Sequence, residues 1–398
     1  MTTATISRPP AAPATTAEQD LIRVSVVDDA VVVRGMIGRW IGEEDGIVLA
    51  GTHRNGRVAV DQIAKETPHV IVLDIEMPEM DGITALPLLL KECPGAAIIM
   101  ASTLTRRNAE ISLKAMSLGA SDYVPKPETN SGVSTSADFR RELIEKVRAL
   151  GERSKRRAKF RLSPKKDPVE RTRPAAAASG SDAAAAAVAS PSSFKLRKPG
   201  SGRPAVLVIG SSTGGPPALS ELFAALDKRV FSAVPIVVTQ HMPAAFTPIL
   251  AEHIGRSADV TAREGVNGED LKAGAVYIAP GGQHLVIDGS RTTPRIGLND
   301  DPPVHYCKPA VDPMFTSAAK VFGSAVLGVV LTGMGQDGAD GGVVIADAGG
   351  TVIAQDQETS VVWGMPGATA HAGCCSAVLP LERIADAINR KVLGSSIA

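Results

Sequence analysis

Short apolar segments alternate with longer amphipathic segments along most of this chain, starting at Leu21. In the first part, apolar runs rich in β-branched residues cover positions 22–27, 69–73, 97–100 and 122–124. Short strands that alternate with helix-length segments are typical of a parallel α/β sheet. Each run ends in polar residues, and open α/β folds bind ligands at the carboxyl ends of their strands. The pattern therefore predicts a doubly wound domain with a polar site along one sheet edge.

The same alternation returns in the second half of the chain. Apolar runs cover 206–209, 235–239, 275–278, 325–331 and 350–353. Several of these runs also lead directly into glycine-rich or histidine-containing turns. We therefore expect a second doubly wound α/β domain, with a mostly parallel sheet and its own site at the strand ends.

Composition divides the chain into four parts. We expect residues 1–20, which mix Thr, Ala and Pro, to be disordered and 21–150 to form the first domain. Residues 151–203 begin with a basic block and continue in an alanine-serine tract without an amphipathic stripe, which indicates a flexible linker. The basic block is compatible with an acidic partner or RNA, but a solvated tether is the simpler interpretation. Residues 204–394 form the second domain.

Charge and cysteine content exclude several classes of protein. The 398 residues include 42 basic and 42 acidic side chains, so the net charge is zero and we expect no nucleic-acid partner. We expect no membrane insertion, because no apolar run approaches the roughly 18 residues of a membrane helix. The N-terminus lacks the basic start and apolar core of a signal peptide. The four cysteines lack metal-ligand spacing, and a reduced, cytoplasmic setting follows.

A candidate nucleophile follows the first strand of the second domain. The spacing Gly210-x-Ser212-x-Gly214 lifts a serine hydroxyl clear of a tight strand-to-helix turn. Amide groups at the start of the following helix can stabilise an oxyanion there. The turn lacks the Lys-Ser/Thr of a P-loop and the G-x-G-x-x-G of a dinucleotide site. A turn that binds phosphate or only packs remains the alternative.

A catalytic serine needs a base and an acid that orients the base. His241 directly follows a predicted strand of the same domain, so we favour it as the base, with His284 and His305 as rivals. For the acid we favour Asp337, in a glycine-rich turn after an apolar strand, over Asp340. The chain order Ser…His…Asp differs from the Ser…Asp…His of α/β-hydrolases, so a different fold is expected. The two other histidines considered, one on a helix face and one far downstream, are His253 and His371.

Three carboxylates lie at strand ends of the first domain: Asp28, Asp29 and Asp74. Bringing them together is unfavourable unless a hard cation such as Mg²⁺ offsets their charge. Ser102 and Lys126 follow two further strands and can contact an anion bound there. This set predicts Asp74 as a phosphoryl acceptor, with Asp28 and Asp29 as metal ligands.

The first domain resembles response-regulator receiver domains, which have a flavodoxin-like sheet. The resemblance rests on Val26-Val-Asp-Asp-Ala30, Leu73-Asp-Ile-Glu-Met-Pro-Glu-Met-Asp-Gly82 and Gly119-Ala-Ser-Asp-Tyr-Val-Pro-Lys-Pro127. It implies phosphorylation of Asp74 by a chemotaxis histidine kinase and Mg²⁺ as a cofactor, with the backbone carbonyl of Glu76 as a further ligand. It also implies switch positions at Ser102 and Tyr123, beside Lys126.

The second domain resembles the catalytic domain of the chemotaxis methylesterases of the CheB family. The matching motifs are Ile209-Gly-Ser-Ser-Thr-Gly-Gly215, Thr239-Gln-His-Met-Pro243, Tyr277-Ile-Ala-Pro-Gly281, Pro309-Ala-Val-Asp312, Leu331-Thr-Gly-Met-Gly-Gln-Asp-Gly338 and Val361-Val-Trp-Gly-Met-Pro366. Ser211 and Gln336 depart mildly from the residues usual in the family, and the linker is unusually long.

This second resemblance implies roles for single residues. Ser212 is the nucleophile, His241 the base and Asp337 its orienter, while Thr213 and the amide of Met334 surround the oxyanion. The implied reaction demethylates glutamate methyl esters on methyl-accepting chemotaxis receptors, giving sensory adaptation, and extends in the family to glutamine deamidation. No cofactor is implied for this chemistry, and we expect a monomer.

Two other functions compete with an esterase. One is a phosphorylation-controlled binding module with a degenerate hydrolase domain, although every triad position holds a competent residue. The other is a receiver coupled to DNA binding, which needs a helix-turn-helix and a basic face after the linker. Neither feature is evident in the sequence.

Overall fold

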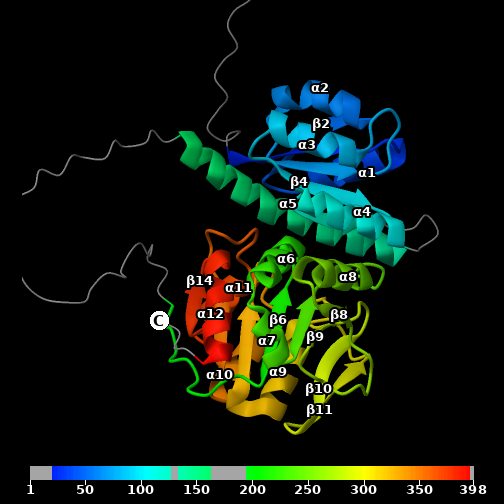
Figure 1. Ribbon diagram of the computed structural model, residues 1–398. Helices are drawn as coiled ribbons and strands as arrows, with labels where there is room; N and C mark the ends of the chain where they lie inside the picture. The colour runs from blue at the N-terminus through cyan, green and yellow to red at the C-terminus, as the bar shows by residue number, and fades with distance from the viewer. Residues whose placement is uncertain (1–19, 127–132, 163–193, 395–398) are drawn as a thin grey trace, which may run out of the picture.

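The computed structural model describes residues 20–126, 133–162 and 194–394, which form two α/β domains (Figure 1). The strands of the first, receiver-like domain are β1 (Ile22–Val27), β2 (Ile47–His53), β3 (Val70–Asp74), β4 (Ala97–Ser102) and β5 (Asp122–Pro125). Its helices are α1 (Val31–Gly42), α2 (Gly56–Glu66), α3 (Gly82–Glu92), α4 (Arg106–Ser117) and α5 (Val133–Leu162).

The receiver-like domain is built on one parallel sheet. Its strand order is β2-β1-β3-β4-β5, and each neighbouring pair is parallel. The β3 strand is buried along its whole length, as expected for a strand with helices over both faces of its sheet. The strand order reverses between β1 and β3, so Asp28 and Asp74 meet at a topological switch point.

The second domain is larger. Its strands are β6 (Val206–Ser211), β7 (Ile236–Gln240), β8 (Thr261–Glu264), β9 (Ala275–Ile278), β10 (His284–Ser290), β11 (Thr293–Asn299), β12 (Val326–Val330), β13 (Thr351–Gln355) and β14 (Ala377–Leu379). Its helices are α6 (Gly215–Ala225), α7 (Lys228–Ala233), α8 (Thr247–Ala258), α9 (Val311–Phe322), α10 (Ala339–Asp347), α11 (Met365–His371) and α12 (Leu381–Leu393), with a 3₁₀ turn at Gly323–Ala325.

The main sheet of this domain has the order β14-β13-β12-β6-β7-β9-β8, and its neighbouring strands are parallel. Alternate side chains of β6 enter opposite layers of the core, as the two-residue period of a strand requires. Leu207 and Ile209 pack with residues of α6, α8 and α12, whereas Val206 and Val208 pack with residues of α9 and α10. Burial on both faces explains why β6 reads as an apolar run. The structure confirms the predicted fold class.

An antiparallel hairpin stands apart from this sheet. In this hairpin β10 pairs with β11. The first pair is His284 with Asn299, and the last pair, next to the turn, is Ser290 with Thr293. Sequence analysis did not predict this hairpin. Its strands are only partly apolar, because the far end of the hairpin is exposed.

The structure corrects the predicted extent of the linker. Helix α5 continues past Gly151 to Leu162, so the start of the basic block is helical rather than flexible. At the other end, the backbone amide of Arg197 donates to the carbonyl of Cys375 at 2.8 Å. The amide of Gly200 donates to Thr351 Oγ1 at 2.9 Å, so this end of the segment lies on the catalytic domain. Residues 163–193, like the segment 1–19 expected to be disordered, lie outside the described residues.

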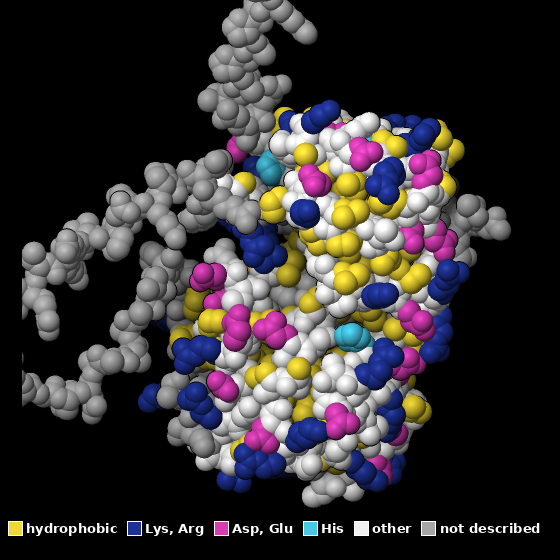
Figure 2. Space-filling model, turned by 45° about the horizontal axis from the view of Figure 1, so that its top comes forward, with side chains coloured by type: hydrophobic (Ala, Val, Ile, Leu, Met, Phe, Trp, Pro, Cys, Tyr) yellow, Lys and Arg dark blue, Asp and Glu magenta, His cyan; other side chains and the backbone are white. Residues whose placement is uncertain are grey.

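The two domains are in contact through helices. Figure 1 shows α4 and α5 of the receiver-like domain above α6 and α8 of the second domain. Tyr123 stacks on Phe246 with ring centroids 4.4 Å apart, and both residues are buried. Arg106 forms an exposed ion pair with Glu252 at 2.8 Å. On the face shown in Figure 2, basic and acidic side chains are interspersed over both domains.

Among the described residues, no helix has both the length and the hydropathy needed to cross a membrane.

Candidate active site

Ser212 lies in the turn between β6 and α6. Its amide donates to the carbonyl of Thr332 at 3.0 Å, and its carbonyl accepts from the amide of Gly215 at 2.7 Å. Gly214 has a φ of 74°, a left-handed conformation that suits glycine, and a Cβ there would collide with Val361. The predicted tight strand-to-helix turn is therefore present, and its serine is fixed at the carboxyl edge of the central strand.

The buried Gln240 side chain connects two loops. One is the turn that contains Ser212 (the serine turn), and the other is the loop that contains His241 (the histidine loop). Its Nε2 donates to the carbonyls of Ser212 at 3.0 Å and His241 at 3.2 Å. Its Oε1 accepts from the hydroxyl of Ser211 at 2.7 Å. The amide of His241 also donates to the carbonyl of Ser211 at 3.1 Å. Ser211 thus takes part in fixing these two loops relative to each other.

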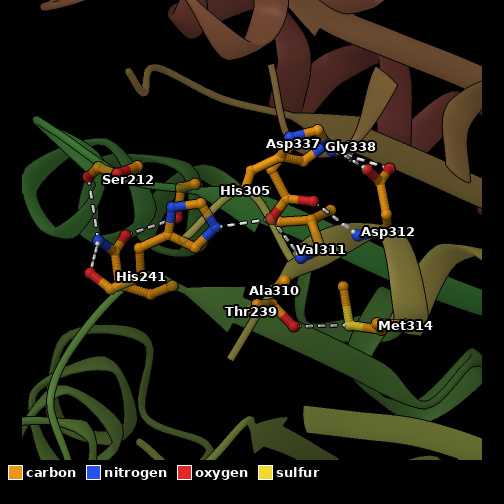
Figure 3. A network of polar contacts seen from close by, with 12 residues as sticks. Ser212, Thr239, His241, His305, Ala310, Val311, Asp312, Met314, Asp337 and Gly338 are labelled. Carbon is orange, nitrogen blue, oxygen red and sulfur yellow. Dashed lines mark hydrogen bonds and ion pairs between the residues drawn. The ribbon is translucent and has the colours of Figure 1, made fainter. Parts of the chain in front are cut away.

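His241 and Asp337 form the central contact of the site. His241 Nε2 lies 2.7 Å from Asp337 Oδ2, and both side chains are at least nine-tenths buried (Figure 3). The structure therefore brings the predicted base and its orienting acid together on loops that follow β7 and β12. Because a carboxylate only accepts, the proton of the neutral imidazole lies on Nε2, and Nδ1 is the acceptor nitrogen.

The Asp337 carboxylate is anchored by the start of helix α9. It accepts from the amides of Val311 at 2.5 Å and Asp312 at 2.9 Å. The Asp312 carboxylate in turn accepts from the amides of Gly338 at 3.0 Å and Gly341 at 2.7 Å. These reciprocal contacts lock the aspartate turn onto α9, so Asp337 cannot rotate away from His241 without losing several buried hydrogen bonds.

The electrostatics of the pair favour an ionised aspartate. Burial opposes the charge on Asp337, but its hydrogen bond with His241 and the two backbone amides lower the pKa of Asp337 overall. Burial likewise opposes a charged His241, yet the adjacent Cys307 and Asp337 raise the pKa of His241 overall. Burial and the neighbouring Asp337 raise the pKa of Asp312 to about 6.

The rival residues have other roles. Both ring nitrogens of His284 are engaged, with Ala310 N at 3.1 Å and the carbonyl of Pro302 at 3.1 Å, so it is a buried structural histidine. His305 Nε2 lies 3.5 Å from Asp312 Oδ2, and Asp340 lies exposed in the first turn of α10. The two other histidines of the second domain lie on helices, His253 on α8 and His371 on α11.

Hydrogen-bond donors without a partner occur in the loops around Ser212. Within the described residues, the amides of Thr213 and Met334 have no backbone partner, and the buried Thr213 Oγ1 has none. Gly333 separates Met334 from Thr332 and lies so close to Ser212 that a Cβ on it would be 2.9 Å from Ser212 Cβ. Buried donors without partners are uncommon, and they mark a place prepared for an acceptor.

The predicted carboxylates of the receiver-like domain also come together. Ligand atoms of Asp28, Asp29 and Asp74 lie within 4.8 Å of one another. Lys126 Nζ lies 2.7 Å from Asp28 Oδ2 and 2.6 Å from Asp74 Oδ1. Burial raises the pKa of Asp74 to about 6, against the opposing effect of Lys126. Oxygen ligands in this number and spacing fit Mg²⁺.

The other receiver residues lie around this cluster. Glu76 is exposed and, with Asp29, lines an adjacent cavity of about 470 Å³. Ser102 ends β4, and its hydroxyl lies 3.1 Å from the hydroxyl of Ser112. Tyr123 turns instead toward the second domain, where it stacks on Phe246. Tyr123, which the sequence predicted as a switch position, therefore takes part in the contact between the two domains.

Three contributors to the site were not singled out from the sequence: Gln240, Asp312 and Cys307. Gln240 and Asp312 lie inside quoted motifs, next to His241 in the first case and at the start of α9 in the second. Cys307 adjoins His241 from a different loop, and no local pattern indicates that contact.

Comparisons with known proteins agree with both resemblances. The CheB methylesterase family model matches residues 207–388, and the response regulator receiver domain model matches 24–136. A protein-glutamate methylesterase/protein-glutamine glutaminase of group 2 operon from Bradyrhizobium diazoefficiens is 50% identical over 376 residues, covering 94% of each chain. A protein-glutamate methylesterase/protein-glutamine glutaminase from Rhodopseudomonas palustris (strain HaA2) is 52% identical over 373 residues, covering 94% of this chain and 95% of the relative.

Among solved structures, the Thermotoga maritima CheB methylesterase catalytic domain is 39% identical, with a TM-score of 0.45, and covers 47% of this chain and 98% of that one. The identity to curated relatives extends over both domains and nearly the whole length. The chain therefore belongs to the CheB family of protein-glutamate methylesterases/protein-glutamine glutaminases, with a receiver domain in front of the methylesterase domain.

Proposed function

We propose that this chain hydrolyses γ-glutamyl methyl esters on methyl-accepting chemotaxis receptors, with Ser212 as nucleophile. The observation that carries the proposal is the 2.7 Å contact between His241 Nε2 and Asp337 Oδ2, on a loop that Gln240 ties to the serine turn. The names of the curated relatives, which give protein glutamate esters and protein glutamine as substrates, support the choice of substrate.

We assign the proton transfers as follows. With its Nε2 proton donated to Asp337, the His241 ring accepts the hydroxyl proton of Ser212 at Nδ1. The serine oxygen adds to the ester carbonyl, and the tetrahedral adduct then loses methoxide, which takes the proton back from Nδ1 and leaves as methanol. Water next adds to the acyl-serine, with His241 again removing and returning a proton, and releases glutamate and free Ser212.

We assign the stabilisation of the negative charge of the adduct to three donors without a partner among the described residues: the amides of Thr213 and Met334 and the hydroxyl of Thr213. Removing one donor of an oxyanion hole lowers kcat by about a hundred- to a thousandfold. The same acyl-serine forms from a glutamine side chain with ammonia as leaving group. We therefore include glutamine deamidation in the proposal.

We further propose that the receiver domain takes a phosphoryl group on Asp74 from a chemotaxis histidine kinase. Asp28 and Asp29, with the backbone carbonyl of Glu76, would hold Mg²⁺, which supplies charge neutralisation for an incoming phosphate when it is bound. Lys126 already spans Asp28 and Asp74 and is placed to contact the phosphoryl oxygens.

Docking of the unphosphorylated receiver on the methylesterase domain is the proposed means of regulation. Val361 and Val362 of the second domain pack against the core of the receiver. Val362 accepts a hydrogen bond from the Gly333 amide, and Val361 lies against Gly214 of the serine turn. A receiver in this position limits access to Ser212, and phosphorylation would act by weakening the contact.

A fluorophosphonate probe tests the catalytic assignment and separates it from a pure binding module. Intact-mass and peptide analysis of the full chain should find a single adduct on Ser212, with labelling strongly slowed in His241→Ala. A chain that remains unlabelled while binding methylated receptors would favour the binding-module hypothesis. Labelling of another serine would reassign the nucleophile.

A further inference from the structure

An exposed aromatic side chain lies at the rim of the candidate active site. Tyr306 is 81% exposed, in a turn closed by reciprocal hydrogen bonds between the backbones of Val304 and Cys307. Single exposed apolar residues are common and need no special explanation. Tyr306 differs from them in its position, its backbone conformation and the group that lies on its ring.

The neighbours of Tyr306 on both sides contact residues at or next to the proposed triad. His305 Nε2 lies 3.5 Å from Asp312, whose backbone amide holds Asp337 (Figure 3). On the other side, Cys307 adjoins His241. The backbone of Tyr306 is therefore fixed between two residues that contact the surroundings of His241 and Asp337, while its ring is exposed.

The backbone of this turn is strained. His305 has a φ of 50° and Tyr306 a φ of 62°, the left-handed region that non-glycine residues seldom adopt. Two consecutive residues of this kind are unfavourable, and such strain gathers at ligand-binding and catalytic sites. The ring gains little packing in return, because most of it faces solvent. A binding role accounts for the strain better than a structural one.

A cation from the other domain already lies on the ring. Arg141 of α5 places its guanidinium carbon 4.7 Å from the centroid of Tyr306, inside the range of a cation–π contact. Asp138 holds the same guanidinium at 3.0 Å. In the docked arrangement, therefore, the receiver presents a positive side chain to the rim of the methylesterase site.

We propose that Tyr306 is a substrate subsite that takes a lysine or arginine side chain flanking the esterified glutamate, and that Arg141 occupies this subsite while the receiver is docked. The inference rests on the proposed function, since it presupposes a protein substrate. It adds that the receiver competes for a specific contact of that substrate, in addition to covering the serine.

The test uses the full chain with the substitution Arg141→Ala. This substitution removes the receiver cation from the Tyr306 ring, so that only the substrate can contact the ring. Methanol release from membranes carrying methylated receptors gives KM and kcat for that parent and for two added substitutions. Adding Tyr306→Ala should raise KM roughly tenfold, the order expected for a cation–π contact, with kcat within about twofold. Adding Tyr306→Phe, which keeps the ring face, should leave KM near that of the parent.

Thermal unfolding checks that the substitutions leave the fold intact, which the exposure of Tyr306 favours. An unchanged KM in the Tyr306→Ala chain would overturn the subsite while leaving the esterase proposal in place. Equal increases in KM in the Tyr306→Ala and Tyr306→Phe chains would do the same. Absence of methanol release from the Arg141→Ala parent would instead contradict the proposed function, and the subsite with it.

Discussion

Gln240 and Asp312 fix the positions of the residues that we propose as the catalytic triad. Gln240 binds carbonyls on both the serine and the histidine loops, and Asp312 binds the turn that carries Asp337. The sequence indicated Ser212, His241 and Asp337 because each follows an apolar strand whose end lies at the same sheet edge. It could not indicate these two supporting roles, since a hydrogen bond between distant loops leaves no local pattern.

Substituting Ser212 or His241 with alanine should each lower ester hydrolysis by several orders of magnitude, because each removes a partner of one proton transfer. Triad residues act as a unit, so the double variant should be little slower than either single variant. Steady-state methanol release measures this, with His253→Ala on α8 as the control histidine. Near-normal turnover by Ser212→Ala would refute the assignment of the nucleophile.

The Asp337→Asn variant should change the pH dependence as well as the rate. The base must be neutral, so activity rises as the pH increases through the pKa of His241, which Asp337 raises. Removing that carboxylate lowers the pKa, and the acidic limb of the kcat/KM profile should move to lower pH. We expect kcat to fall by about two to four orders of magnitude. An acidic limb that stays in place would mean that Asp337 does not set the titration of the base.

At the scale of helices and strands, hydrophobic runs predicted the strands of both sheets that carry site residues, often to within one or two residues. For example, the predicted runs 22–27 and 275–278 coincide with β1 and β9. The hairpin β10–β11 was missed because its strands are half-exposed and weakly apolar. The helical extension of α5 was missed because this segment is mostly charged and has no apolar stripe. An apolar stripe is the sequence signal that identifies a packed helix.

Gly333→Ala tests the close approach of the loop after β12 to the serine turn. Its Cβ would collide with Met365 Sδ and lie 2.9 Å from Ser212 Cβ, so the loop must shift and take the Met334 amide with it. We expect kcat to fall about a hundredfold or more, in the range for loss of an oxyanion donor. Gly202→Ala is the matched control, because a Cβ there meets nothing within 4 Å. Equal activity of the two variants would argue against the Met334 amide as a donor.

For the whole molecule, the sequence predicted two domains and their order, but not how they meet. The contact depends on side chains such as Tyr123 and Phe246, which belong to separate motifs and stack only in the folded chain. The Val361–Val362 segment connects this interface to the serine turn. The receiver is therefore in contact with the elements that shape the candidate active site.

Phosphorylation should relieve this contact only when Asp74 and the metal site are intact. We expect a small phosphodonor with Mg²⁺ to raise the methylesterase rate of the full chain. Asp74→Asn should stay at the basal rate, and a chelator should abolish the response, because three clustered carboxylates repel an incoming phosphate. The comparison of rates with and without donor checks this. Stimulation that survives Asp74→Asn would place the regulation elsewhere.

The most direct test of the account is methanol release from receptor membranes methylated with tritiated methyl groups. We predict that the full chain, supplied with Mg²⁺ and a phosphodonor, releases labelled methanol at a rate proportional to enzyme. Ser212→Ala, equally folded, should release no more than membranes alone. Equal release by the two proteins, or none by the unsubstituted chain, would contradict the claim that Ser212 cleaves receptor glutamyl esters.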